Sequence, residues 1–229
     1  MNKEGNTYTI VYASVLAIFA AVLLAFTSQA LSEKQKRNET VDKMIQILRS
    51  VNVTATNANA QQTYEKLIKE SYVVNNKGEK IEGDAFSINL AKELEKPKDE
   101  SHYPVFVANI DGSDKYILAL RGTGLWGPLW GYISLESDKN TIFGADFSHE
   151  GETPGLGSEI STPHFSDQFK GKHLFKDGKF VGVAVVKPGT LVTGKEAVDG
   201  ISGGTITSHA VEHMLDHTLE GYVGFLKKE

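Results

Sequence analysis

The chain has 229 residues, of which 40% are hydrophobic and 23% charged, so it has room for one substantial folded domain and an appendage but not for two full domains. Its formal net charge of -5 argues against a nucleic-acid partner, because binding to a phosphate backbone depends on concentrated lysine and arginine. The absence of cysteine excludes disulfides, thiolate nucleophiles, iron–sulfur clusters and cysteine-attached haem, so any redox chemistry must come from a cofactor held in another way.

The first predicted element is an uncharged segment between Glu4 and Glu33. Its apolar part, Tyr8–Leu31, is longer than the roughly 20 helical residues that cross a hydrocarbon core of about 30 Å. We therefore predict one N-terminal tail and transmembrane helix over residues 1–31. A cleaved signal peptide is the alternative, because Ser28-Gln29-Ala30 has the small-x-small pattern of a processing site. Its apolar run exceeds the usual length of about 7 to 15 residues, which favours a retained anchor.

Residues 32–60 are predicted to form a stalk helix and a linker. From Ser32 to about Val53 the apolar side chains fall on one stripe of a helix, which is expected to dock on the folded domain. The following segment, Thr54–Ala60, is small and polar and is predicted to be a hinge.

Residues 61–229 are predicted to form one α+β domain with a mixed, mainly antiparallel sheet and flanking helices. Short runs rich in Val, Ile, Phe and Tyr predict strands. These runs are Ser71–Val74, Ala85–Leu90, Val105–Ile110, Tyr116–Arg121, Gly131–Leu135, Thr141–Phe147 and Phe180–Val186. Asp111-Gly112 and Asp177-Gly178 lie between such runs and predict hairpin turns, so antiparallel pairing is favoured.

A closing helix is predicted over Thr207–Leu226, with one apolar face. The residues expected to be buried on that face are Val211, Met214, Leu215, Leu219 and Tyr222. His209, His213 and His217 recur along this helix at intervals of four, but without carboxylate or cysteine companions they do not predict a metal site.

The most informative motif is the turn that precedes the closing helix, Asp199-Gly200-Ile201-Ser202-Gly203-Gly204-Thr205. A glycine-rich turn lets backbone N–H groups approach an anion, and the helix behind it directs partial positive charge at the same point. The pattern predicts a phosphate site. The plainer alternative is an ordinary helix start, with Thr205, Thr207 or Ser208 as the N-cap.

Two other loops carry residues suited to a flat ligand. Arg121–Gly131 surrounds two tryptophans with four glycines and a proline, and an aromatic face can stack on a conjugated ring. His149–Gly157 has a path fixed by its glycines and proline, and Glu152 and Thr153 offer polar groups to the edge of a heterocycle. Taken singly, the first loop also fits a buried turn and the second a surface turn.

Behind one N-terminal apolar helix, the motifs Gly-x-Gly-Leu-Trp, His-x-x-Glu-Thr-Pro-Gly-Leu-Gly and Asp-x-x-Ser-Gly-x-Thr follow in that order. In this arrangement the whole chain resembles the C subunit of the bacterial Na+-translocating NADH:quinone oxidoreductase. The resemblance implies FMN joined through its phosphate to Thr205, installed by a flavin transferase that uses FAD as donor. The residues it assigns to the cofactor are Leu125, Trp126, Glu152, Thr153, Leu156, Asp199, Ser202, Gly203, Gly204, Thr205 and Thr207.

The same resemblance implies a role for each of these positions. Trp126 and Leu156 would sandwich the flavin ring, and Glu152 and Thr153 would lie along it. Ser202 and Thr207 would flank the phosphate. Asp199 would mark the motif for the transferase, Leu125 and Gly203 would belong to the cofactor-binding loops, and Gly204 stands where the family usually has alanine.

The function that the resemblance implies is electron relay inside a six-subunit NADH:quinone reductase, with no complete catalytic cycle in this chain alone. The donor would be an iron–sulfur centre in partner subunits, and the acceptor a covalent flavin in the membrane-embedded B subunit. The family places the flavin domain on the periplasmic side of the bacterial inner membrane. Positive charges favour the opposite orientation, since Lys34, Lys36 and Arg37 follow the apolar run and Lys3 precedes it.

Two alternatives stay open from the sequence. The G subunit of the related ferredoxin-oxidising electron-transport complex shares the threonine motif. In a cofactor-free, membrane-anchored binding or sensor domain, all three loops would be merely structural.

Overall fold

The computed structural model describes residues 6–228. By its internal contacts the chain divides into two units, Met1–Lys43 and Met44–Glu229. Helix α1 (Asn6–Ser50) contains no glycine or proline and runs without a break through the segments predicted as membrane span and stalk. The predicted span and stalk are therefore one helix, which ends three residues earlier than Val53.

Among the helices of residues 6–228, α1 is the one that is long and apolar enough to cross a membrane. The apolar side chains of its first part are not covered by protein: Phe19 is 68% exposed, Leu24 70% and Phe26 73%. A contiguous apolar surface of this kind is rare on a protein in water and is typical of a membrane-anchoring segment.

The last turns of α1 belong to the compact unit Met44–Glu229. Ile47, Leu48 and Val51 are at most 1% exposed, so the end of the stalk is part of the core. Asn52 stops the helix in a left-handed conformation with φ of 61°, a conformation that asparagine tolerates at helix ends.

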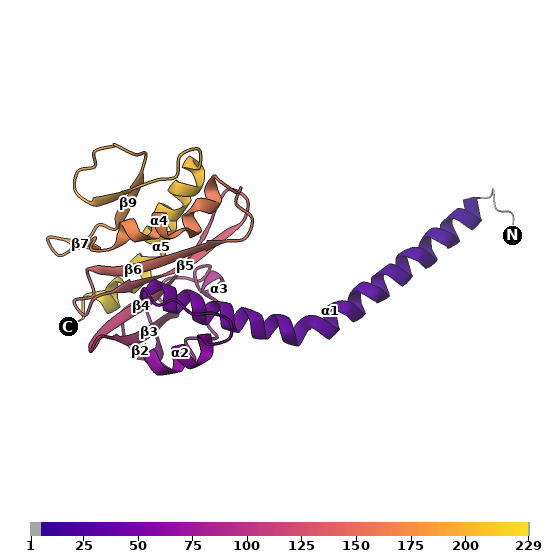
Figure 1. The fold of residues 1–229 in the computed structure, drawn as a ribbon, viewed down its shortest axis with the longest axis horizontal. Helices are drawn as coiled ribbons and strands as arrows, with labels where there is room; N and C mark the ends of the chain where they lie inside the picture. Colours follow the sequence, from indigo (N-terminus) through magenta and orange to yellow (C-terminus); the bar gives the residue numbers. More distant parts are fainter. Residues whose placement is uncertain (1–5, 229) are drawn as a thin grey trace. The chain divides into compact units, whose positions relative to one another are not determined.

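A six-stranded antiparallel sheet forms the centre of this unit (Figure 1). Its strands are β1 (Ile68–Val74), β2 (Lys80–Ile81), β3 (Tyr103–Ile110), β4 (Ser113–Thr123), β5 (Pro128–Leu135) and β6 (Ile142–His149), in the order β2-β1-β3-β4-β5-β6. Asp111 and Gly112 join β3 to β4 with φ values of 51° and 80°, which confirms the predicted two-residue hairpin. The mainly antiparallel sheet is also confirmed.

Helix α5 (Thr205–Leu226) packs against this sheet and begins two residues earlier than predicted. All five residues expected on its buried face are at most 1% exposed, which confirms the amphipathic pattern. Because α5 is fixed along its whole length, its first turn is held in a defined place relative to the strands.

The smaller elements complete the unit and were only partly predicted. They are α2 (Ala60–Leu67), α3 (Leu90–Glu93), 3-10 helix η1 (Gly157–Ser161), α4 (Pro163–Ser166), 3-10 helix η2 (Asp167–Phe169), β7 (Phe175–Lys176), β8 (Lys179–Phe180), β9 (Val183–Val186) and β10 (Glu196–Asp199). The Asp177-Gly178 hairpin joins β7 to β8 as expected. Strands β9 and β10 pair in parallel.

Two predicted strands were wrong in whole or in part. Ala85–Leu90 is a turn, because the Asp84 carboxylate accepts the Phe86 N–H at 3.0 Å and the Asn89 side chain caps α3. Phe180–Val186 is divided between β8 and β9 by Gly182, whose φ of 65° interrupts the extended path.

Candidate functional site

The turn before α5 is built on the end of strand β10. Asp199 pairs with Val186 of β9, and the Gly200 N–H donates to the Val186 carbonyl at 2.7 Å. Gly203 then takes a φ of 75°, and Gly204 is the N-cap of α5. The glycines therefore supply the left-handed step that turns the chain from strand into helix.

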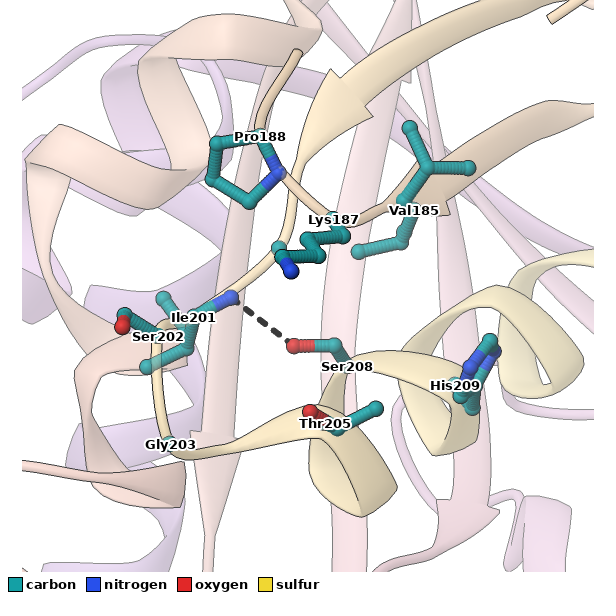
Figure 2. A pocket seen from close by; sticks show the side chains of 11 residues that line it. Val185, Lys187, Pro188, Ile201, Ser202, Gly203, Thr205, Ser208 and His209 are labelled. Atoms are coloured by element: carbon teal, nitrogen blue, oxygen red, sulfur yellow. Dashed lines mark hydrogen bonds between the residues drawn. The ribbon is translucent and has the colours of Figure 1, made fainter. Parts of the chain in front are cut away.

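Ser208 closes this turn from the helix side. Its hydroxyl donates to the Gly204 carbonyl at 2.9 Å and accepts the Ile201 N–H at 2.9 Å, and Figure 2 shows the second of these bonds crossing the turn. The side chain is 4% exposed. The turn is therefore fixed by the helix that it introduces.

The first turn of α5 is open to an anion. The N-cap residue is Gly204, so no N-cap side chain accepts a hydrogen bond from the first turn, and that turn has no acidic residue. The alternative in which Thr205, Thr207 or Ser208 acts as the N-cap is therefore wrong. The first N–H groups of a helix have no acceptor within the helix, and the dipole of a 22-residue helix adds partial positive charge there.

The carboxylate of Glu152 joins the three loops that the sequence singles out. It accepts the Thr207 hydroxyl of the α5 turn at 2.6 Å and the Trp126 N–H of the tryptophan loop at 3.0 Å. The backbone N–H of Glu152 donates to Nδ1 of His149 at 3.2 Å. Glu152 is 4% exposed, so one buried side chain sets the positions of all three loops.

Glu152 is held in its ionised form. Burial raises its pKa, but hydrogen bonds from the Thr207 hydroxyl and from the N–H groups of Trp126 and Leu125 outweigh that effect and lower the pKa below its ordinary value. A Cβ at Gly124 or Gly157 would collide with a carboxylate oxygen of Glu152. Both loops therefore need glycine to pass this close to the carboxylate.

A cavity of about 240 Å³ lies between these loops and α5. It is lined by Leu125, Glu152, Thr153, Leu156, Gly157, Gly203, Gly204, Thr205, Ile206 and Thr207. Among these, Leu125, Leu156 and Ile206 are 49%, 41% and 59% exposed, and the neighbouring Trp126 is 67% exposed. Exposed apolar side chains gathered around a cavity are typical of a binding site for a flat, partly apolar ligand.

A second cavity, of about 420 Å³, lies on the other side of the turn, beside the end of β9 (Figure 2). Gly203 and Thr205 line both cavities, while Ser202, Lys187 and His209 line only the second. In Figure 2 the side chain of Lys187 extends over the turn. The exposed residue Thr205 thus lies on the wall between the two cavities.

Comparison with known proteins decides the family. The family model of the FMN-binding domain matches residues 124–220, which contain the second and third loops and all of the first loop except residues 121–123. The chain is 30% identical over 241 residues to the C subunit of the Na(+)-translocating NADH-quinone reductase of Vibrio anguillarum, with 98% of this chain and 94% of the relative covered. The chain belongs to the family of C subunits of the Na(+)-translocating NADH-quinone reductase.

Two solved structures of this family share the fold. The crystal structure of the C subunit from Parabacteroides distasonis is 60% identical, with a TM-score of 0.83, and the match covers 87% of this chain and 98% of that one. The structure of Shewanella oneidensis NqrC is 27% identical, with a TM-score of 0.68, covering 82% and 97%. These matches confirm the family and the fold class expected from the sequence.

Most of the residues that the sequence assigned to the cofactor lie together. The cavity between the loops is lined by Leu125, Glu152, Thr153, Leu156, Gly203, Gly204, Thr205 and Thr207. Ser202 lines the second cavity. Trp126 lines neither cavity, and Asp199 is fixed through its backbone, which exchanges two hydrogen bonds with the Gln168 amide.

The structure also places residues beside the two cavities that the sequence did not indicate. Ile206 is on the rim, and Lys187 and Pro188 enclose the second cavity from the loop after β9. Lys187 and Pro188 had no local signal, because their approach depends on the parallel pairing of β9 and β10.

Proposed function

We propose that this chain carries FMN as a phosphoester on Thr205 and relays electrons between other subunits of a Na(+)-translocating NADH-quinone reductase. The observation that carries the proposal is the position of Thr205. Its side chain is exposed at the uncapped start of α5, on the wall of a cavity whose three loops are joined by Glu152.

The residues present fit the phosphate end of FMN. The N–H groups of the first turn of α5 are directed at the space where an ester on Thr205 would begin, and no acidic side chain of that turn opposes a phosphate. Gly203 and Gly204 keep the backbone close, since a Cβ at Gly203 would meet Leu156 at 2.7 Å. Lys187, on the second cavity, adds a cation that has no ion-pair partner within residues 6–228.

The residues also fit the ring end. Leu125, Leu156 and Ile206 offer an apolar rim, and Thr153 offers a hydroxyl at the edge of the cavity. The exposed Trp126 can swing over this rim, because its backbone is fixed to Glu152 while its side chain is 67% exposed. When bound, a flavin supplies a group that accepts and passes on one or two electrons.

The partners of the chain follow from the same proposal. A flavin transferase would attach FMN from FAD, and the neighbouring subunits, including the membrane-embedded B subunit, would supply and receive electrons. We propose that residues 1–31 hold the N-terminal tail and anchor and 32–60 the stalk and linker, with the flavin-binding domain over 61–229. Residues 44–60 pack within the compact unit.

We also propose that the flavin domain lies on the periplasmic side of the bacterial inner membrane. Because the chain has no cysteine, a Thr190→Cys variant places a single thiol on an exposed loop of that domain. A membrane-impermeant maleimide should label it in intact spheroplasts as well as in permeabilised ones. Labelling that requires permeabilisation would place the domain in the cytoplasm.

Mass spectrometry of the chain produced with its transferase tests the covalent link. The intact mass is expected to rise by one FMN less one water, and the tryptic peptide containing Thr205 should carry the flavin. Thr205→Ala should lose the flavin without a change in far-UV circular dichroism, whereas Thr205→Ser, which keeps a hydroxyl, should retain it. The same flavin on Ser202 or Ser208 would refute Thr205 as the attachment residue, and a colourless wild-type chain would refute the function.

The alternatives from the sequence lose support. Membership of the C-subunit family argues against the G subunit of the ferredoxin-oxidising complex. The match to the FMN-binding domain model argues against a cofactor-free sensor domain.

A further inference from the structure

The cavity of about 420 Å³ beside the end of β9 contains a second basic side chain besides Lys187. It is the imidazole of His209, four residues after Thr205 on α5. None of the described residues that line this cavity carries a carboxylate. A cavity wall with basic side chains and no opposing carboxylate is suited to an anion.

His209 and Thr205 lie on the same face of α5. Residues four apart in a helix are neighbours, one turn after the other. Helical side chains also lean towards the N-terminus of their helix, so the imidazole of His209 covers the turn that contains Thr205. Figure 2 shows the two residues on successive turns beside the cavity that both of them line. A group attached to Thr205 therefore begins next to this imidazole.

The imidazole of His209 is available to a ligand. The residue is exposed, and its side chain forms no hydrogen bond or ion pair within residues 6–228. His213, the next histidine along α5, stacks on His217 and lines other cavities. Among the three histidines of this helix, His209 is therefore the one that belongs to the cavity at Thr205.

Contacts from α5 hold the loop that carries Lys187 opposite His209. The Glu212 carboxylate, on the next turn of the helix, accepts the Val185 N–H at 3.3 Å before the loop and Lys195 Nζ at 2.7 Å after it. Both ends of the loop are thus fixed to the helix that carries the imidazole. The same bonds occupy Glu212, so the first carboxylate that follows on α5 is not free to pair with His209.

We propose that His209 binds the phosphate of the attached FMN, together with Lys187 from the facing loop. This role rests on the proposed attachment of FMN to Thr205. The imidazole would donate an N–H to a phosphate oxygen, and the positive charge that a histidine gains between about pH 8 and pH 5 would add to that of Lys187. A phosphate that joins Thr205 to the flavin keeps two non-bridging oxygens, which is enough for both side chains.

Phosphorus NMR of the flavinylated full chain in a phosphate-free detergent tests this contact. A free phosphate monoester loses its second proton near about pH 6. The ester to Thr205 removes that ionisation, so the phosphorus signal does not titrate on its own at this pH. An imidazole beside it does titrate in this range. The signal should therefore shift between pH 5 and pH 8 in wild type and stay constant in His209→Gln.

Two other variants assign the response to one imidazole. His213→Gln is the matched control, because it removes a histidine one turn further along α5 that does not line this cavity. Its phosphorus signal should respond to pH as in wild type. Lys187→Gln should displace the signal at every pH and keep the response, because a fixed charge is lost and the imidazole remains. A wild-type signal that does not respond to pH, or an equal response in His209→Gln, would overturn the proposal.

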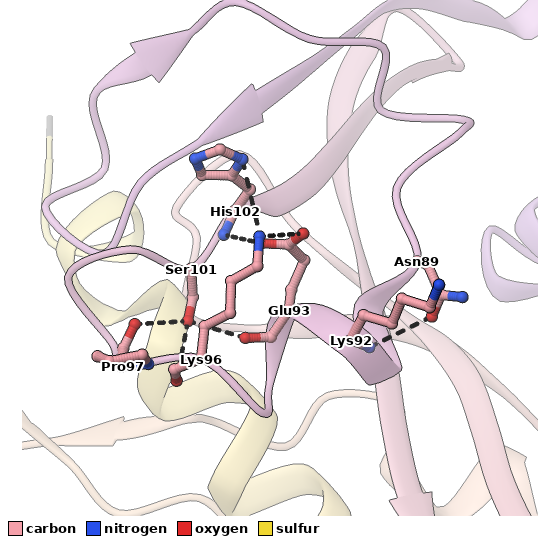
Figure 3. A network of polar contacts seen from close by, with 7 residues as sticks. All are labelled: Asn89, Lys92, Glu93, Lys96, Pro97, Ser101 and His102. Carbon is pink, nitrogen blue, oxygen red and sulfur yellow. Dashed lines mark hydrogen bonds and ion pairs between the residues drawn. The ribbon is translucent and has the colours of Figure 1, made fainter.

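The histidine resonances of the wild-type chain give a second readout that needs no variant of the site. Attachment of flavin should move the proton–carbon resonance of the His209 ring and leave that of His102 in place. His102 lines neither cavity at Thr205 and is held in a separate polar network (Figure 3). Its backbone N–H donates to the Glu93 carboxylate at 3.0 Å, and its Nδ1 lies 4.0 Å from that carboxylate. Equal movement of both resonances would indicate a general effect of attachment and contradict the contact.

Mass spectrometry of each sample separates the role of His209 from the attachment itself. A wild-type chain without flavin on Thr205 after production with the transferase would refute both. A chain that carries the flavin there but whose phosphorus signal ignores pH would refute the role of His209 alone. If His209→Gln is not flavinylated, the wild-type titration and the two histidine resonances still decide the question.

Discussion

Glu152→Gln tests whether one buried carboxylate holds the three loops together. Glutamine keeps the shape of the side chain and removes its charge. The carboxylate accepts hydrogen bonds from the Thr207 hydroxyl and the Trp126 N–H. A hydrogen bond to a charged group contributes about 1.5–3 kcal/mol and a neutral one about 0.5–1.5 kcal/mol, so two bonds lose about 2 kcal/mol in total. For a unit of this size that lowers Tm by about 4–8 °C.

Tryptophan fluorescence follows this unfolding, because the chain has two tryptophans: Trp126, whose N–H is bonded to Glu152, and Trp130 in the strand β5 that follows the same loop. Thermal unfolding at pH 7 should show the lower Tm in Glu152→Gln. Glu150→Gln is the matched control, since Glu150 is exposed and two residues away on the same loop. A Glu152→Gln variant as stable as this control would refute the role of the carboxylate.

The pH dependence follows from the sign of the pKa shift. The pKa of Glu152 is lowered from 4.5, so the stabilisation is present at neutral pH and is lost as pH falls below about 4.5 through the folded-state pKa. The difference in Tm between wild type and Glu152→Gln should therefore shrink between pH 7 and pH 3. A difference that stays constant over this range would mean that the lost stability comes from packing rather than charge.

Three other variants test separate parts of the domain. Burial raises the pKa of Asp146 from 3.8 to about 6, although the Arg49 guanidinium lies 3.1 Å away. The free energy of unfolding of wild type should therefore rise by up to about 3 kcal/mol as pH falls from 7 towards 4. In urea titrations, Asp146→Asn should not show this rise. Gly203→Ala should lower the free energy of unfolding by about 1 kcal/mol, because φ is 75° and its Cβ would meet Leu156; urea titration showing a variant as stable as wild type would contradict that reasoning. Trp126→Ala should change the free energy of unfolding by at most about 0.5 kcal/mol, since the side chain is 67% exposed. It should shift the absorbance of bound flavin, and a loss of flavin attachment as large as the change in absorbance would argue against a position of Trp126 at the ring.

Local signals in the sequence predicted the parts of the fold that depend on local physics. Asp111-Gly112 predicts its hairpin because both residues adopt positive φ at little cost. The buried face of α5 follows from helical spacing alone. The segment Ala85–Leu90 misled because its apolar residues alternate as in a strand, while Asp84 and Asn89, which flank them, bind the backbone into a turn and a cap.

The residues of the site show why its chemistry was easier to predict than its geometry. The order of the three motifs carries the resemblance to the C-subunit family, and that resemblance predicted the cofactor class, in agreement with the match to the FMN-binding domain. The sequence did not indicate that the Thr207 hydroxyl is buried against Glu152, because the two residues are 55 positions apart. A donor that looks free for a phosphate in the sequence is therefore used to hold the loops.

The first three residues of α5 separate the proposed attachment residue from the residue that supports the loops. Thr205 faces the cavities, Ile206 contributes an exposed apolar rim, and Thr207 is 2% exposed and bonded to Glu152. Because successive helical residues point about 100° apart, one turn of helix presents an exposed hydroxyl, an exposed apolar side chain and a buried structural anchor in three directions. If the proposed attachment is right, a transferase that needs an exposed hydroxyl would act on Thr205 and leave Thr207 untouched, although both are threonines at the start of the same helix.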